Sequence, residues 1–238
     1  MYQTHKTYIT SDMKMSDLII ENSSLLLLLE HFEIDFAVND KTVKQLCNEY
    51  KIDLSVFLVF GNLYNGFYPD KKEINALEDV SSIIRFLKSS HRFYKHDKYP
   101  ELKAFLVQLH ERQERENILL IEKFFNDYFD EVLEHLDYEE SKVFPYICGL
   151  IENGNVKTGS NFSANEYRDH HSDIETKLAD LKNLLLKHIS LKNDFSLRRK
   201  FLFSLFELEF DLSIHSLIED KILLPLVAKI EINQVNGK

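Results

Sequence analysis

Histidine and glutamate recur in one layout in two stretches of this sequence, HLDYEESKVFP at 135–145 and HSLIEDKILLP at 215–225. Each stretch begins with His, has Glu four residues later and ends on Pro. On an α-helix, residues four apart lie on the same face, so each His can share a target with its Glu. Imidazole nitrogen and carboxylate oxygen are metal ligands, and the layout therefore predicts metal binding. The pairs are His135 with Glu139 and His215 with Glu219.

A further histidine precedes each pair at the same distance. His91 lies 44 residues before His135, and His171 lies 44 residues before His215. This is an internal repeat of one helical hairpin, with one ligand on its first helix and two on its second. Two such hairpins folded together bring the candidate ligands into one core, and these are His91, His135, Glu139, His171, His215 and Glu219.

The types of these residues narrow the choice of metal. Imidazoles and carboxylates without thiolate suit iron, manganese or zinc, and disfavour copper(I) or an iron–sulfur cluster. The set exceeds what one tetrahedral zinc needs, so it divides over two ions, with Glu139 and Glu219 free to bridge them. Coordination positions on the two ions then stay open for an oxo bridge and a small molecule. We expect two iron ions that bind dioxygen or nitric oxide. Zinc or manganese could occupy the same site in place of iron.

A metal-free interpretation is that these residues are solvated ion pairs or packed histidines in a helical interaction module. Ionisable groups are rarely buried without partners. The surrounding residues are nevertheless apolar, and packing alone leaves the shared register of the two halves unexplained. The apolar neighbours are Val132, Leu136, Val143 and Phe144 for the first pair, and Leu212, Leu217, Ile222 and Leu223 for the second.

Composition indicates the elements that must position these residues. Only 6 of the 238 residues are glycine and 4 are proline, which predicts an all-α protein. Amphipathic periods predict a four-helix bundle. With Pro100 read as a break, His110 falls on the helix of His135, about 37 Å away at 1.5 Å per residue and out of reach of the same ions. The expected helices cover about 77–96, 101 to beyond 139, 164–189 and 195–230.

Shorter helices are expected before the bundle. Asn22, Ser23 or Ser24 can cap one of them, and Asp53 can cap another. The stretch NGFYPDKKEIN at 65–75 collects turn-forming residues and is the best linker candidate. We therefore predict a small helical N-terminal domain at 1–72 and a bundle at 73–238.

Charge and cysteine content exclude several classes of function. The net charge is -10 with no basic run, which disfavours nucleic acid and anionic membranes as partners. The longest apolar run, LLLLL at 25–29, is too short to cross a bilayer, and the first residues do not resemble an export signal. Cys47 and Cys148 are outside any CxxC motif. A reducing cytoplasm is the expected location.

The order His, His-x3-Glu, His, His-x3-Glu resembles the hemerythrin-like family, and more closely its di-iron branch of repair-of-iron-centres proteins. The stretch LLLLLEHFEIDFAVNDKTVKQLCNEYKID is similar to the small helical domain that precedes the bundle in that branch. The resemblance implies a non-haem di-iron protein of nitrosative and oxidative stress that helps to restore iron–sulfur clusters. It implies iron binding by all four repeated histidines, with the two glutamates as bridges.

One departure from that branch concerns the N-terminal domain. The family usually carries a Cys-Cys pair and then Gly-Gly after "DF", where this chain has Ala37, Val38, Asn39 and Asp40. Cys47, ten residues beyond Ala37, is expected to be a small buried hydrophobe. Electron supply or iron transfer through the cysteine pair is therefore not expected, and the domain would dock on the bundle or mediate dimerisation.

Two functions remain open, and they leave undecided whether the protein is an enzyme. The first is a stress-response di-iron protein that binds or reduces nitric oxide or dioxygen, or donates iron for cluster repair. The second is a non-catalytic sensor or carrier that signals to a protein partner, which the missing thiols favour slightly. A hydrolytic two-metal enzyme ranks lower, because a bundle core offers a narrow pocket rather than a substrate cleft.

Overall fold

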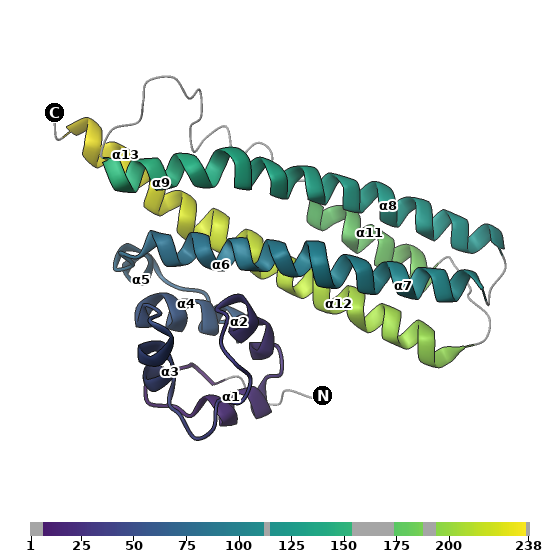
Figure 1. The fold of residues 1–238 in the computed structure, drawn as a ribbon, viewed down its shortest axis with the longest axis horizontal. Coiled ribbons are helices and arrows are strands. Elements are labelled where there is room, and N and C mark those ends of the chain that lie inside the picture. Colours follow the sequence, from purple (N-terminus) through teal and green to yellow (C-terminus); the bar gives the residue numbers. More distant parts are fainter. Residues whose placement is uncertain (1–6, 112–114, 154–173, 188–193, 237–238) are drawn as a thin grey trace. The chain divides into compact units, whose positions relative to one another are not determined.

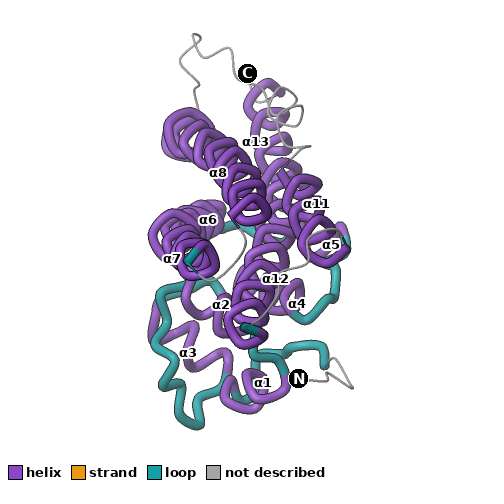
Figure 2. The backbone as a smooth tube through the Cα atoms, turned by 90° about the vertical axis from the view of Figure 1, so that its right-hand side faces the viewer, coloured by secondary structure: helices purple, strands orange, loops and turns teal. Residues whose placement is uncertain are grey.

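The computed structural model describes residues 7–111, 115–153, 174–187 and 194–236. Throughout these ranges the chain is helical between short turns, with no strand and a single β-bridge between Lys14 and Thr42 (Figure 2). The predicted all-α fold class is confirmed. By its contacts the chain divides into two compact units, Met1–Ser90 with Leu217–Lys238 and His91–Ser216, and both divisions fall inside continuous helices.

Five short helices form the N-terminal region (Figure 1). Phe32 and Phe60 of this region belong to an aromatic cluster. Phe32 and Phe60 both contact Phe86, with ring centroids 4.8 Å apart in each case. Side-chain caps begin three of the five helices, and the predicted cap at Asp53 is one of them, since its carboxylate accepts from the N–H of Val56. Ser24 precedes the second helix without a side-chain cap bond. The helices are α1 (Met15–Glu21), α2 (Leu25–His31), α3 (Val43–Tyr50), α4 (Leu54–Tyr64) and α5 (Lys71–Asn75).

Four helical rods follow in the described part of the chain, and three of them contain a π-helical turn (η). Within the second unit, α7 and α11 each lie beside α8 (Figure 1). None of the described helices has the length and apolar character needed to cross a membrane. The rods are α6–η1–α7 (Val80–Phe93, Tyr94–Lys98, Tyr99–His110), α8–η2–α9 (Arg115–Tyr138, Glu139–Val143, Phe144–Asn153), α11 (Ile174–Lys187) and α12–η3–α13 (Phe195–Ile218, Glu219–Leu223, Leu224–Asn236).

The predicted helix end before Pro100 is wrong, because the first rod continues through this proline to His110. A proline inside an α-helix lacks an N–H, and its ring clashes with the carbonyl four residues earlier. The π-turn immediately before it changes the register, since the N–H of Tyr99 donates to the carbonyl of Tyr94, five residues back. The wider turn accommodates the ring without ending the helix.

The same arrangement occurs twice more and explains the repeated prolines. The N–H of Phe144 donates to the carbonyl of Glu139, and Pro145 follows. In the last rod the N–H of Leu224 donates to the carbonyl of Glu219, before another proline. Each proline of the repeated motif therefore marks a π-turn that begins at its glutamate.

Asn62 joins α4 to the chain before α1, and its substitution tests this packing. Its Oδ1 accepts from the N–H of Ile9 at 2.7 Å, and its Nδ2 donates to the carbonyls of Ile9 and Leu58. Asn62→Asp replaces both donors with an acceptor in a buried place, and we expect unfolding free energy to fall by about 3 kcal/mol. Urea unfolding followed by circular dichroism measures the change.

The matched control is Asn39→Asp, since the Asn39 amide is exposed and donates only to the carbonyl of Ala37 at 3.3 Å. It should change stability by less than about 0.5 kcal/mol. Equal effects of the two substitutions would contradict the role assigned to Asn62.

Candidate metal centre

The predicted ligands lie where α-helices pass into π-turns. His135 is in the last turn of α8, and Glu139 is the first residue of η2. His215 and Glu219 hold the same places in α12 and η3. His91 lies in the last turn of α6, three residues before η1. Helical turns with one extra residue often occur at functional sites, because they redirect side chains.

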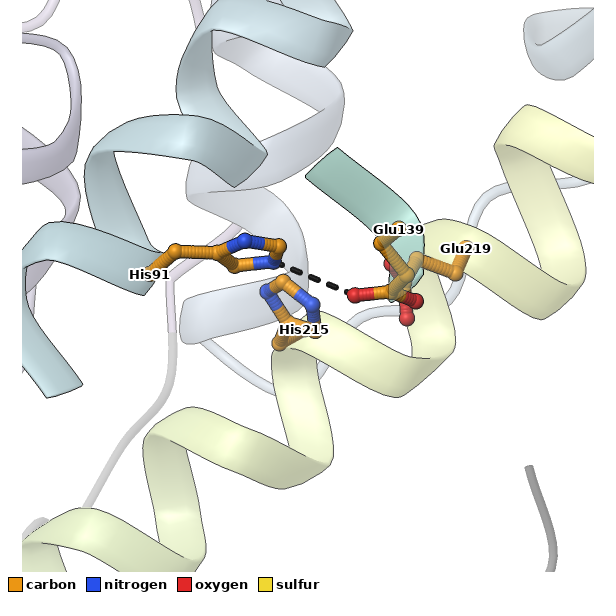
Figure 3. Close-up of side chains that lie close together, drawn as sticks. All are labelled: His91, Glu139, His215 and Glu219. Atoms are coloured by element: carbon orange, nitrogen blue, oxygen red, sulfur yellow. Dashed lines mark ion pairs between the residues drawn. The ribbon is translucent and has the colours of Figure 1, made fainter. Parts of the chain in front are cut away.

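Four of these side chains point toward one another, as Figure 3 shows. One ligand atom from each of His91, Glu139, His215 and Glu219 lies within 4.8 Å of the ligand atoms of the other three. The side chain of His215 is 4% exposed, and the other three are 0% exposed. His215 and Glu219 are one turn apart on a continuous helix. The group is able to hold a metal ion.

Glu139 faces a different histidine with each of its oxygens. Its Oε2 is 3.2 Å from Nε2 of His91, and its Oε1 is 3.1 Å from Nε2 of His135. Two ligand atoms that bind one ion at about 2.1 Å and at right angles to each other lie about 3.0 Å apart. Both separations therefore suit a pair of ligands on one ion. A carboxylate placed in this way suits a bridge between two ions.

The electrostatics of the cluster also fit a cation. Glu139 and Glu219 are both fully buried, and their nearest ligand atoms lie within 4.8 Å of each other. Two carboxylates this close repel each other, and the removal of each carboxylate from water costs several kcal/mol. The neighbouring residues Val143, Phe144 and Leu223 are buried and apolar. A divalent cation among the four donors offsets both costs.

Comparison with known proteins agrees with this geometry. The model of the hemerythrin HHE cation binding domain matches residues 82–227. The chain belongs to the hemerythrin family. The matched residues of this hemerythrin domain contain every predicted ligand and all three π-turns. No curated protein matches the chain significantly.

Two predicted ligands of the hemerythrin domain, His135 and His171, are not among the four clustered residues. His135 is near the cluster through its 3.1 Å contact with Glu139, and its side chain is 12% exposed. His171 lies outside the described residues. The structure thus brings five of the six predicted residues together and leaves the sixth as a prediction.

Glu140 belongs to the surroundings of the cluster, although the sequence did not indicate it. Its Oε1 lies 3.0 Å from Nδ1 of His91 and 3.0 Å from Nζ of Lys95, which also binds Asp137. The hydrogen bond from His91 and the Lys95 ammonium hold the pKa of Glu140 at about 2. An acceptor at Nδ1 orients a histidine and leaves Nε2 facing a metal. The only signal in the sequence is the doubled glutamate.

Tyr94 and Asp211 form a second buried pair beside the cluster. The Tyr94 hydroxyl donates to Oδ2 of Asp211 at 2.9 Å, and both residues are fully buried. The Tyr94 ring also stands edge-on to His215, with centroids 5.8 Å apart. Asp211 lies four residues before His215, so it belongs to the same face of α12. That spacing was the available signal for it.

The other described histidines do not join the cluster. His110 ends the first rod rather than lying on the rod of His135, because the helix does not stop at Pro100. Its Nδ1 is 3.6 Å from Oε2 of Glu122. His31 is buried against Phe86 and His96 is exposed, as expected of residues outside the site. His5, His170 and His188 lie outside the described residues.

Glu140→Gln tests the support of His91. A neutral amide is a weaker acceptor for the Nδ1–H, so we expect metal affinity to fall by about 10- to 100-fold. Competition against a chelator measures the affinity. The matched control is Asp137→Asn, which alters the contact of Lys95 but does not touch His91. If Glu140→Gln keeps the affinity within twofold of the control, Glu140 does not support the ligand.

Cys47 provides a test of thiol chemistry in the N-terminal region. Burial raises its pKa to about 12, with a further contribution from the nearby Asp53 charge. The thiolate is the reactive form, so Cys47 should resist a disulfide reagent at pH 8 until the protein unfolds. Cys148 is only half-buried and serves as the internal control. Rapid labelling of Cys47 in the folded protein would contradict this assignment.

Proposed function

We propose that this hemerythrin domain holds two iron ions and binds a small diatomic molecule, nitric oxide or dioxygen. The observation that carries the proposal is the convergence of buried imidazole and carboxylate donors in an apolar core. The ligand set proposed is His91, His135, Glu139, His171, His215 and Glu219. The donor types suit iron, with zinc or manganese as substitutes.

The side chains around the proposed site have different roles. Iron supplies one-electron redox chemistry and open coordination positions for a diatomic. Glu139 would hold metal through both of its oxygens, since one faces His91 and the other faces His135. Glu140 accepts from Nδ1 of His91 and fixes the direction of that ring. Phe144, 5.5 Å from His91 between ring centroids, helps to exclude water.

We further propose that the protein acts in the cytoplasm, in the response to nitrosative and oxidative stress and in the repair of iron–sulfur clusters. The likeness of the N-terminal region to the repair-of-iron-centres proteins supports this part of the proposal. That region consists of packed short helices, as expected for the small domain of this branch.

A sensor or carrier that signals to a protein partner is the second candidate, and the turn at 37–40 favours it. Asn39 has a left-handed backbone, with φ of 52°, the conformation that glycine adopts most easily. The chain thus keeps a tight turn where the family has Gly-Gly, but has no thiol at Ala37 or Val38. A partner or a second copy could bind this surface without any redox role for it.

Metal analysis of the full chain tests the proposed centre. Protein produced with iron should contain about two irons per chain and absorb visible light through ligand-to-iron charge transfer. His135→Ala and His215→Ala should each remove most of both signals. His110→Ala is the matched control, because His110 pairs only with Glu122 among the described residues and should leave the metal in place. The di-iron proposal would be contradicted by protein without bound metal, or by one zinc that His135→Ala and His215→Ala leave in place.

Gas reactions then separate the two candidate functions. Reduced protein supplied with an electron donor should consume nitric oxide or dioxygen over many turnovers if it is a reductase. Stoichiometric and reversible binding without turnover would favour the sensor or carrier.

A further inference from the structure

The N-terminal half of α12 has two apolar faces. The inner face packs in the bundle and consists of Leu197, Phe201, Leu205 and Leu208, all buried. A second stripe follows the helical spacing i, i+3, i+4, i+7, i+8 and i+11 on the outside. A surface helix of a monomer normally carries polar residues on that side. The outer stripe is Phe195, Arg198, Arg199, Leu202, Phe203 and Phe206, and these residues line a groove of about 270 Å³.

The aromatic rings of this outer stripe are unusually accessible. Phe195 is 79% exposed, Phe203 is 66% exposed and Phe206 is 42% exposed. Local cations cover them only in part, with Arg198 5.7 Å from the ring centroid of Phe195 and Lys182 4.7 Å from that of Phe206. A contiguous row of exposed phenylalanines indicates an interaction surface.

The charges along the outer stripe indicate what binds it. Arg199, Phe203 and Glu207 follow one another at intervals of four residues, so the face reads cation, ring, anion. Arg199 and Glu207 are both exposed. Glu207 also forms an ion pair with the buried Lys98, which holds its carboxylate in place. When two copies of this face meet antiparallel, the Arg199 of each copy lies opposite the Glu207 of the other.

We propose that the outer stripe of α12 binds the same stripe of a second copy of this chain, antiparallel, about a two-fold axis near Phe203. In such an isologous contact Phe203 meets its own counterpart, and each Arg199 lies opposite the Glu207 of the other copy. Arg198 and Arg199 would also attract an anionic lipid surface or an acidic polymer, but such a partner offers no cation for the exposed Glu207 carboxylate. The contact depends on no metal ligand.

Cysteine cross-linking tests the symmetry directly. A residue beside a two-fold axis lies close to its own counterpart, so Phe203→Cys should form an intermolecular disulfide under mild oxidation. The matched control is Leu120→Cys on α8, where Leu120 is 53% exposed and lies outside the stripe. Both changes are made in a Cys148→Ser background, because Cys148 is partly accessible. We expect cross-linking at least tenfold faster at position 203, and equal rates would overturn the proposal.

Sedimentation of the full chain provides the second measurement. The unmodified protein should show a concentration-dependent dimer. Phe203→Glu places two carboxylates at the axis and should raise the dissociation constant by tenfold or more, whereas Leu120→Glu should leave it unchanged. Both sites are exposed, so loss of folding is not expected, and circular dichroism verifies this. A protein that stays monomeric at hundreds of micromolar, or a Phe203→Glu dimer as tight as the original, would overturn the proposal.

Discussion

Two carboxylates that are fully shielded from water and lie a few ångströms apart constrain the rest of this hemerythrin domain. Glu139 and Glu219 would repel each other in an apolar core without a compensating charge. A cation shared by these carboxylates and the histidines around them would offset the two negative charges. The cluster is therefore best understood as a cation site whose protein part is already assembled.

The support for this cluster is asymmetric in the described part of the chain. His91 is held by Glu140, which in turn contacts Lys95, so a hydrogen-bonded chain leads from the cluster to the surface. On the side of His215, the fully buried neighbours are Tyr94 and Asp211. His91 and His215 thus have different polar groups behind them. In the proposed two-ion site, this difference would give the two ions unequal surroundings.

The shared face of each His–Glu pair could be predicted because helical spacing is a local property and the sequence repeats it. Both His–Glu pairs lie one turn apart on their helices, as the period of 3.6 residues requires. The cap at Asp53 was predictable for the same reason. Pro100 was misread because its effect depends on the hydrogen-bond register of the preceding turn. Nothing in the composition of residues 94–98 marks that turn as π-helical.

The contacts between residues of different rods could not be predicted from the sequence. Glu140 points away from His135, as its position on the helix requires, but its partner His91 is 49 residues away in the sequence. The same applies to Tyr94 and Asp211, which are 117 residues apart. A single sequence gives the face on which a side chain lies. It does not give the rotation of the opposite helix that decides which residue meets it.

The π-turns also fix the length of the chain inside the domain. A π-turn holds one residue more than an α-turn, so each of them shifts the phase of the helix that follows. Loss of one residue from η3 would turn α13 by about 100° and move Leu226 and Val227 out of the core. Loops at the surface tolerate insertions and deletions far better. Length changes during evolution are therefore expected between the rods of this domain, and the three turns should keep their count of residues.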